Sequence, residues 1–166
     1  MGVRIRGDIR GLEKALKKGS SLDIKNRLGK PVGEALVSST RERFRTSKDP
    51  TGRPWKSLSS TTVKSGFKKR DYKKSGGLKK GVAEREAKRL ILVQRGRLKN
   101  SVKSAADGTM VAVGSNLDYA RIHQKGGQAG RRKKVKIPAR PYLGVSDSDQ
   151  REIERLTAKF LKEPFR

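Results

Sequence analysis

The chain has 166 residues, a formal net charge of +27, no Cys and a single His. This length fits one domain, residues 1–166; the missing cysteines exclude disulfides, thiolate catalysis and zinc–thiolate sites, and one His excludes a poly-histidine metal site within one chain. No apolar run approaches the ~18 residues of a membrane span, and the N-terminal residues lack the apolar region of a secretory signal.

The first third of the chain predicts one strand and three helices. Residues 3–6 alternate apolar and basic side chains, as in a short strand, and apolar residues recur at helical spacing over residues 9–16 and again over residues 22–28. Pro31 suits the first turn of a longer helix, which we expect over residues 31–45. Its apolar face would be formed by four residues at i, i+4 spacing: Val32, Leu36, Thr40 and Phe44.

A turn and a basic segment follow this helix. Asp49, Pro50 and Gly52 are typical turn residues, because Asp can accept backbone hydrogen bonds, Pro fixes φ and Gly allows a positive φ. Residues 64–80 contain Gly, Ser and Lys but few apolar side chains, which predicts an exposed or disordered loop. With a frayed helix after this loop, we expect residues 64–89 to form a basic, flexible insertion.

The middle of the chain predicts a β-hairpin and a short helix. Asp107 and Gly108 separate residues 101–106 from residues 109–114 and form a two-residue hairpin signal, since both residues tolerate a positive φ. A short helix carrying Tyr119, Ile122 and His123 is expected over residues 118–125.

The last third predicts a basic loop, a third strand and a final helix. The basic loop covers residues 126–134 and leads into a short strand at Val135 and Ile137. Ser146 and Asp149 resemble a capping box, with Asp in place of the usual Glu, at the start of the helix. The apolar face of this helix consists of Ile153, Leu156, Phe160 and Leu161.

These elements predict an α+β fold: a small antiparallel sheet packed with an amphipathic N-terminal helix and a C-terminal helix, with long basic loops. We expect the hairpin, the strand at Ile137 and the two long helices to form the core. This core is thin, since Leu, Ile, Val and Phe make up about 22% of the residues, just above the ~20% below which a highly charged chain is disordered. A partner is therefore expected to complete the fold.

The positive charge gathers in two segments. Residues 64–99 carry 14 basic and 3 acidic side chains, and residues 121–140 carry 8 basic and no acidic ones. A solvated loop is the plainer explanation of a Lys-rich run, but this excess indicates a polyanion or an acidic protein surface nearby. With an aromatic content of 5% and no recognition helix, contact with a nucleic-acid backbone is favoured over base stacking or base readout. The candidate phosphate contacts are Lys68, Lys69, Arg70, Arg131, Arg132, Lys133 and Lys134.

Two aromatic residues, Trp55 and Tyr142, each allow two interpretations. Trp55 is the only Trp and either fills the core beneath the turn at Asp49, the more common role, or anchors an interface, where Trp is enriched. Tyr142, together with Leu143, stands between Pro141 and Gly144 and presents the same choice.

We expect no enzymatic activity and no cofactor or metal. The sequence lacks a phosphate-binding loop motif, a dinucleotide-binding motif, a zinc-protease motif and a nucleophile elbow. A catalytic site would have to rest on His123 with distant carboxylates such as Asp118 or Asp107, and no nucleophile–base pair can be named.

Four motifs in order resemble the phage virion morphogenesis family, which includes the P2-like tail completion proteins and the Mu-like G protein. After Phe44, the motifs are Asp49-Pro50-x-Gly52-x-x-Trp55-x-x-Leu58-Ser59-x-x-Thr62, then Gly96-Arg97-Leu98-x-x-Ser101, then Val113-Gly114-Ser115-Asn116-x-x-Tyr119-Ala120-x-x-His123-Gln124-x-Gly126-Gly127, then Ile137-Pro138-Ala139-Arg140-Pro141-Tyr142-Leu143-Gly144 with Ser146-Asp147. Each motif is weak alone, but four in this order are specific.

The resemblance implies a structural protein of a tailed phage that acts in tail completion or head–tail joining. Its implied state is a homo-oligomeric ring, commonly hexameric, around the DNA channel at the neck or the head-proximal tail end, assembled in the host cytoplasm. Neighbours would be connector, tail-tube or tail-terminator proteins and the phage DNA backbone, without a membrane. The alternatives are a free, sequence-independent nucleic-acid-binding protein and a capsid morphogenesis factor.

The resemblance also gives the candidate residues their expected roles. The seven basic residues named above would face DNA. Eight others would fix loop geometry or subunit contacts rather than perform chemistry: Asp49, Pro50, Gly52, Trp55, Tyr119, His123, Arg140 and Tyr142.

Overall fold

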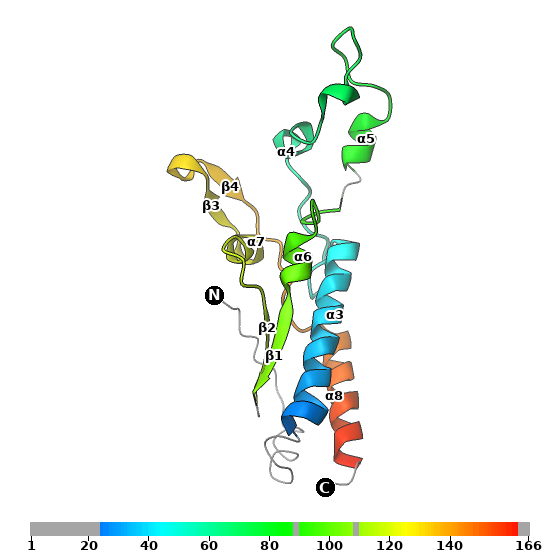
Figure 1. Ribbon diagram of the computed structural model, residues 1–166, viewed down its shortest axis with the longest axis vertical. Helices are drawn as coiled ribbons and strands as arrows, with labels where there is room; N and C mark the ends of the chain where they lie inside the picture. Colours follow the sequence, from blue (N-terminus) through cyan, green and yellow to red (C-terminus); the bar gives the residue numbers. More distant parts are fainter. Residues whose placement is uncertain (1–23, 88–89, 108–109, 163–166) are drawn as a thin grey trace.

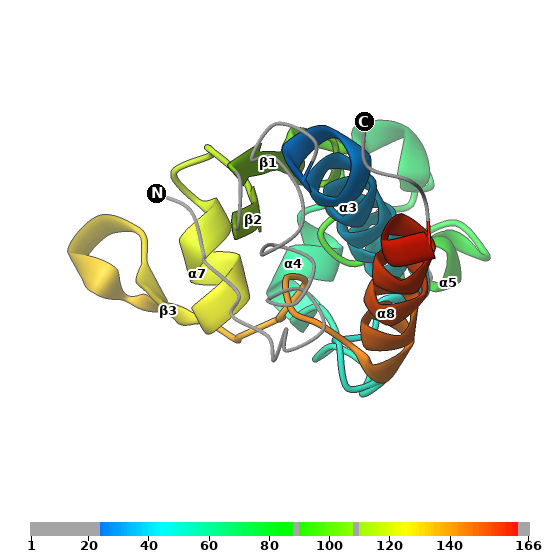
Figure 2. The same cartoon turned by 90° about the horizontal axis from the view of Figure 1, so that it is seen from below.

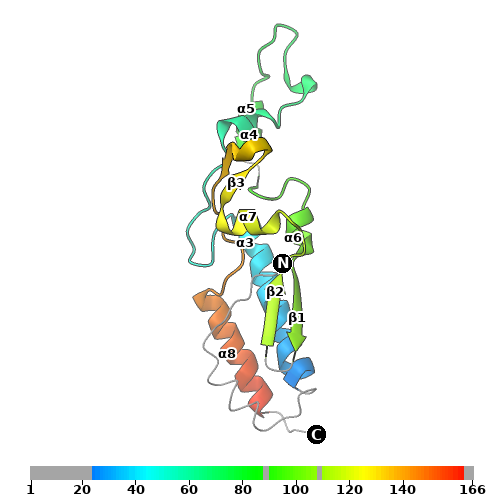
Figure 3. The same cartoon turned by 90° about the vertical axis from the view of Figure 1, so that its left-hand side faces the viewer.

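The computed structural model describes residues 24–87, 90–107 and 110–162 and has an elongated shape (Figures 1 and 3). Within these ranges it contains six α-helices and two antiparallel sheets of two strands each, which confirms the predicted α+β class. The strand expected at residues 3–6 and the helix expected at residues 9–16 lie outside the described residues. No helix in the described part of the chain combines the length and the apolar character that a membrane span requires.

The long helix α3 (Lys30–Thr46) forms the centre of the molecule. Pro31 lies in its first turn, and the four residues of the predicted apolar face are all buried, so the helix expected over residues 31–45 is confirmed. A π-helical turn, Ile24–Gly29, precedes it and buries Leu28. Figure 2 shows α3 between the β1–β2 hairpin and helix α8, and it contacts both.

Helix α8 (Asp147–Lys162) packs along α3 and begins at the predicted capping box. The Asp149 amide donates to Ser146 Oγ at 3.2 Å, and the Ser146 amide donates to the Asp149 carboxylate at 2.8 Å. Phe160 is buried, and Ile153 and Leu156 are partly buried against the core, as the helical spacing predicts. These contacts confirm the final helix.

The first hairpin pairs β1 (Lys103–Asp107) with β2 (Met110–Gly114). In its register Asp107 is opposite Met110, so Asp107 ends strand β1 and is not a turn residue. The prediction of a turn at residues 107–108 is therefore wrong at Asp107, which takes part in the ladder. Val113 is buried in the core, whereas Met110 is 58% exposed.

The second hairpin pairs β3 (Gly127–Ala129) with β4 (Val135–Ile137). The strand predicted at Val135 and Ile137 exists, but its partner is β3, which lies in a stretch predicted to be a loop. The sequence predicts this strand in the core, and that prediction is wrong: the two strands form a ribbon that projects away from α3 and α8 (Figure 1), and Val135 is 56% exposed.

The stretch from residue 60 to residue 87, which includes the basic loop predicted at residues 64–80, contains local structure. Helix α4 (Ser60–Lys64) is followed by a 3-10 turn, Lys69–Asp71, and by helix α5 (Val82–Ala87). The Asp71 carboxylate accepts a hydrogen bond from the Lys68 amide at 2.7 Å and pairs with Arg85 at 3.3 Å. The ordered structure of this stretch depends on local polar contacts, and a search for apolar periodicity does not reveal such contacts.

Candidate functional site

The segment Pro141 to Gly144 is held by side chains from two distant elements. From α3, the Arg43 guanidinium donates to the carbonyl oxygens of Tyr142 at 3.1 Å and Gly144 at 2.9 Å. Trp55 Nε1 donates to the carbonyl oxygen of Pro141 at 2.8 Å. We call this meeting point the junction: residues 140–144 with the side chains that hold them.

Helix α7 (Ala120–Lys125) also fixes the junction, through Gln124. Gln124 Nε2 donates to the Leu143 carbonyl at 2.8 Å, and Gln124 Oε1 accepts from the amides of Tyr142 and Leu143, both at 2.9 Å. The Tyr142 hydroxyl donates to the Ala120 carbonyl, and burial raises the pKa of Tyr142 to about 12, so the phenol keeps this proton. One glutamine thereby satisfies three backbone groups that packing removes from water.

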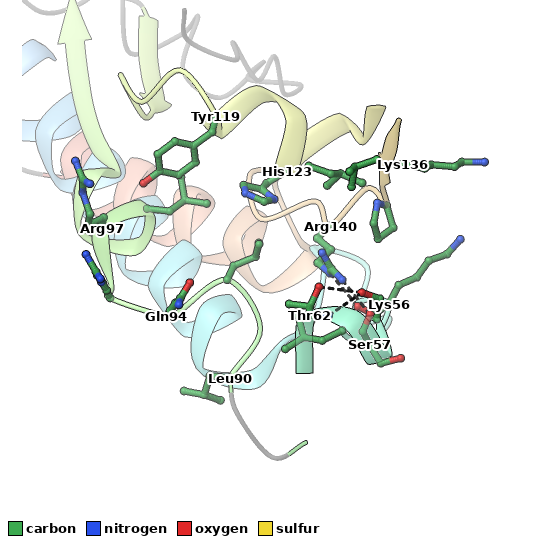
Figure 4. A pocket seen from close by; sticks show the side chains of 18 of the residues that line it. Lys56, Ser57, Thr62, Leu90, Gln94, Arg97, Tyr119, His123, Lys136 and Arg140 are labelled. Atoms are coloured by element: carbon green, nitrogen blue, oxygen red, sulfur yellow. Dashed lines mark hydrogen bonds between the residues drawn. The ribbon is translucent and has the colours of Figure 1, made fainter. Parts of the chain in front are cut away.

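Arg140 joins the junction to the chain after Trp55. Its Nε donates to the Lys56 carbonyl at 2.8 Å, and a terminal nitrogen donates to the Ser57 carbonyl at 2.9 Å, as the dashed lines in Figure 4 show. The Arg140 amide donates to the His123 carbonyl at 2.8 Å. Arg140 is thus a positioning residue that fixes two loops to each other.

Three aromatic rings pack beside these hydrogen bonds. Phe44 lies edge-on to Trp55, with 5.6 Å between ring centroids, and 5.2 Å from the Tyr142 ring. All three residues are buried, and Tyr142 is only 1% exposed. In the isolated chain the two aromatic residues with open interpretations therefore lie in the core.

The turn predicted at Asp49 covers the outer side of the junction. Asp49 Oδ1 accepts hydrogen bonds from the amides of Thr51 at 2.8 Å and Arg53 at 2.9 Å. Pro50 lies directly against Gly144, where it leaves no room for a side chain. The three turn residues thus shape the loop and close one side of the junction.

A buried ion pair between Arg43 and Asp149 connects α3 to α8, and each side chain is 6% exposed. Burial opposes ionisation of Asp149, but hydrogen bonds from Ser39 and Ser146 and the charge of Arg43 outweigh it, so the pKa of Asp149 lies below its ordinary value. Burial also opposes the charged form of Arg43 and so lowers the pKa of its guanidinium. Both groups are nevertheless charged in the folded protein at neutral pH, since a guanidinium keeps its proton in proteins.

This pair predicts a loss of stability in acid. Since the folded-state pKa of Asp149 lies below the unfolded one, its carboxylate stabilises the fold above about pH 4, and this contribution is lost as pH falls through the folded value. In urea titrations from pH 7 to pH 3, Asp149→Asn should flatten the decline in the free energy of unfolding. Asp147→Asn, at an exposed carboxylate of the same helix, should leave the decline near that of the unaltered protein; equal curves for all three proteins would contradict this account.

Glycine at position 126 is required by both φ and space. Its φ is +72°, and a Cβ there would come within 2.8 Å of the Ala139 amide nitrogen. Gly52 also has a positive φ, +83°, but open space around it. We expect Gly52→Ala to cost about 1–2 kcal/mol, the strain of the left-handed conformation, and Gly126→Ala to cost clearly more. Urea unfolding followed by the fluorescence of Trp55 measures both; equal costs would show that the Ala139 contact relaxes freely.

The seven predicted DNA contacts lie in two separate places. Arg131, Arg132 and Lys134 are exposed at the tip of the β3–β4 hairpin, and the backbone of Lys133 lies there too. Lys68, Lys69 and Arg70 are exposed in the segment between α4 and α5. Figure 1 shows both places toward the same end of the molecule, projecting in different directions. The structure brings each cluster together but keeps the two apart.

Tyr119 and His123 lie beside each other near α7, with 5.9 Å between ring centroids, and line a groove (Figure 4). His123 Nδ1 is buried without a hydrogen-bond partner among the described residues. Burial, with the charge of Arg140, lowers the pKa of His123, so its ring is neutral at pH 7. Over the residues that the structure describes, no three His, Asp or Glu side chains are grouped as a metal site requires.

Three residues were not predicted from the sequence in the roles that they have in the structure. Arg43 and Gln124 hold the junction, and Asp149 pairs with Arg43. Arg43 follows Leu36 by seven residues, a helical spacing that places it on the buried face of α3. A charged residue at such a position indicates a buried partner elsewhere. Gln124 stands next to His123 in a motif and carried no signal of its own.

The comparison with protein families decides the identity of the chain. Residues 8–162 match the sequence model of the phage virion morphogenesis family. The chain belongs to this family. It is 45% identical over 62 residues to the Mu-like prophage FluMu G protein 2 of Haemophilus influenzae, a match that covers 37% of the chain and 45% of that relative. It is 26% identical over 155 residues to the putative capsid assembly protein G of Escherichia phage Mu, covering 92% of the chain and 90% of that protein. No solved structure matches the chain.

Family membership confirms the resemblance drawn from the four motifs. The structure adds that the first, third and fourth motifs meet at the junction, through Trp55, Gln124 and Tyr142. These motif residues hold loops together, and the seven predicted DNA contacts lie outside the motifs. In this family member the motif residues thus build the framework from which the charged segments project.

Proposed function

We propose that the chain is a non-enzymatic structural protein of a tailed phage, active in tail completion and head–tail joining. The observation that carries this proposal is the family match over residues 8–162. It is supported by side chains that link loops and helices by hydrogen bonds, a role that suits a structural part of a virion.

The proposed state is a homo-oligomeric ring, hexameric by expectation, at the neck or the head-proximal tail end. A net charge of +27 suits a ring whose lumen faces DNA, because phosphates neutralise the repulsion between subunits. The exposed hairpin tip at Arg131, Arg132 and Lys134 supports DNA contact without sequence specificity. Neighbouring subunits would also cover apolar surface that the thin core leaves exposed.

A second candidate is a role in capsid morphogenesis. The observation that favours it is the similarity over 92% of the chain to the phage Mu protein described as a putative capsid assembly protein. In that role the chain would act before DNA packaging and would be absent from the finished particle.

Inactivation of the gene in its phage distinguishes these candidates. Under the tail-completion proposal, electron microscopy shows DNA-filled heads and separate tails, and the purified protein restores joined, infectious particles when mixed with them. Under the capsid proposal, normal heads are missing and the mixture stays inactive. Mass spectrometry of purified, DNA-filled particles gives a second answer, since only the first proposal predicts the chain there. Normal particles without the chain would favour a free nucleic-acid-binding protein.

The ring itself is tested by the mass of the purified, nuclease-treated protein. We expect light scattering in high salt to give about six subunits, because high salt screens the repulsion and removes bound nucleic acid. Negative-stain images of the same sample should show rings. A monomer that stays a monomer after addition of connector and tail proteins would contradict the ring.

A further inference from the structure

A groove of about 950 Å³ lies between four parts of the chain that the junction brings together. Its walls come from residues 56–62, from residues 90–98, from Tyr119 and His123, and from the strand β4 with Pro138 and Arg140. Figure 4 shows Tyr119 and His123 facing the loop of Gln94 across this space. The groove is separate from both basic clusters that are expected to face DNA.

The groove collects apolar side chains that the fold leaves exposed. The described residues include five exposed large hydrophobic side chains, and three of them line this groove: Leu90 (45% exposed), Tyr119 (38%) and Val135 (56%). Leu92 and Ile137, which are partly buried, extend the same lining. Exposed apolar residues that gather in one hollow indicate a surface for another protein, whereas single ones need no explanation.

The charged residues of the groove are all positive. Lys56, Arg95, Arg97, Lys136 and Arg140 line it, and no Asp or Glu does. Arg140 is engaged with backbone carbonyls, while the side chains of the other four form no ion pair with a carboxylate of the described residues. Figure 4 shows Arg97 on one side and Lys56 and Lys136 extending outward on the other. The cations therefore flank an apolar floor.

We propose that this groove docks an acidic, apolar segment of another phage assembly protein. Carboxylates of such a segment would meet the flanking cations, while its apolar side chains would cover Leu90, Tyr119 and Val135. DNA fits less well, because its phosphates would lose bound water in the groove and would leave the apolar side chains of the floor uncovered. A second copy also fits less well, because the apolar face of its acid-rich helix α8 already packs against its own core. The proposal rests on the assembly role and holds for a tail or a capsid partner.

The test places a photo-crosslinking amino acid, p-benzoylphenylalanine, at Leu90, Tyr119 or Val135, one at a time, in cells that produce the phage. We expect all three groove positions to form adducts with the same partner, a phage protein other than this chain. The crosslinked peptide should combine Asp or Glu with apolar residues. The same group at Met110, which is exposed on β2 outside the groove, should not form this adduct. Mass spectrometry of the purified adduct identifies the peptide.

Charge reversal tests the electrostatic half of the proposal. Arg95→Glu with Arg97→Glu should lower the adduct yield about tenfold, because like charges would then face each other. The matched control, Lys103→Glu with Arg151→Glu, makes the same change of net charge at exposed positions outside the groove and should leave the yield unchanged. Trp55 fluorescence confirms that both variants are folded.

Adducts with a second copy, with DNA or with a peptide that lacks carboxylates would overturn the proposal, and so would the absence of adducts at all three positions. Finished particles from the same cells are assayed separately for the chain. Its absence there would contradict tail completion and leave the docking result intact, so the two failures are distinguishable.

Discussion

Arg43→Ala should destabilise the protein by about 3–5 kcal/mol, the range found when one partner of a buried ion pair is removed. The change leaves Asp149 charged and buried, and it leaves the carbonyls of Tyr142 and Gly144 without their donor. Urea unfolding at pH 7 measures this loss. Trp55, the only Trp, lies at the junction and reports it by fluorescence.

The matched control is Arg45→Ala, two residues further along the same helix. Arg45 is 71% exposed and pairs with Glu42 on the surface, where water and salt screen the attraction. Its removal should barely change the urea midpoint. Similar losses for the two variants would show that the buried pair contributes no more than a surface one and would contradict this account.

A double variant separates the charge from the packing. Arg43→Met with Asp149→Leu replaces the pair by apolar side chains and leaves no isolated buried charge. We expect it to lose less stability than Arg43→Ala alone. A loss as large as that of Arg43→Ala would show that the hydrogen bonds to the 142–144 backbone, and not the ion pair, dominate.

Replacement of Arg131, Arg132, Lys133 and Lys134 by Ala should weaken DNA association and leave the fold intact. The three whose side chains are described are exposed at the hairpin tip and hold no other element in place. Each lost phosphate contact lowers the slope of log affinity against log salt by about 0.9, so the slope should fall by up to about 4. Fluorescence anisotropy with a duplex of random sequence, measured at several KCl concentrations, gives this slope.

Four basic residues of α8 provide a control of equal charge. Arg151, Arg155, Lys159 and Lys162 are exposed, and their replacement by Ala removes the same formal charge from a different face. This variant should keep most of the slope of log affinity against log salt. If both variants lose it equally, the binding depends on net charge alone, and an unchanged slope in the tip variant would remove the hairpin from the DNA-contacting surface.

Elements with strong periodicity or a cap could be predicted from the sequence, and elements held by long-range polar contacts could not. The stripe from Val32 to Phe44 and the capping box at Ser146 are local patterns, and both are present in the structure. The pairing of β3 with β4 was missed because each strand has three residues, too few to show an alternation.

The site was predictable as a set of motifs but not as an arrangement. The order of the motifs gave the family, whereas the bonds that join them connect residues far apart, such as Arg43 and Asp149, which are separated by 106 positions. Gln124 shows the same difficulty, since its three hydrogen bonds go to backbone groups, which any residue carries. No side-chain pattern marks such an acceptor or donor in advance.

The β3–β4 ribbon gives two surfaces one mechanical support. Val135 and Ile137, both on β4, line the apolar groove, and Arg131 and Arg132 lie at the tip of the ribbon. A ladder of only three residues on each strand holds the ribbon in shape. A partner bound against β4 would hold the ribbon in one position and so fix the direction of its charged tip. Assembly would then follow an order, in which the chain binds its protein neighbour first and the nucleic acid second.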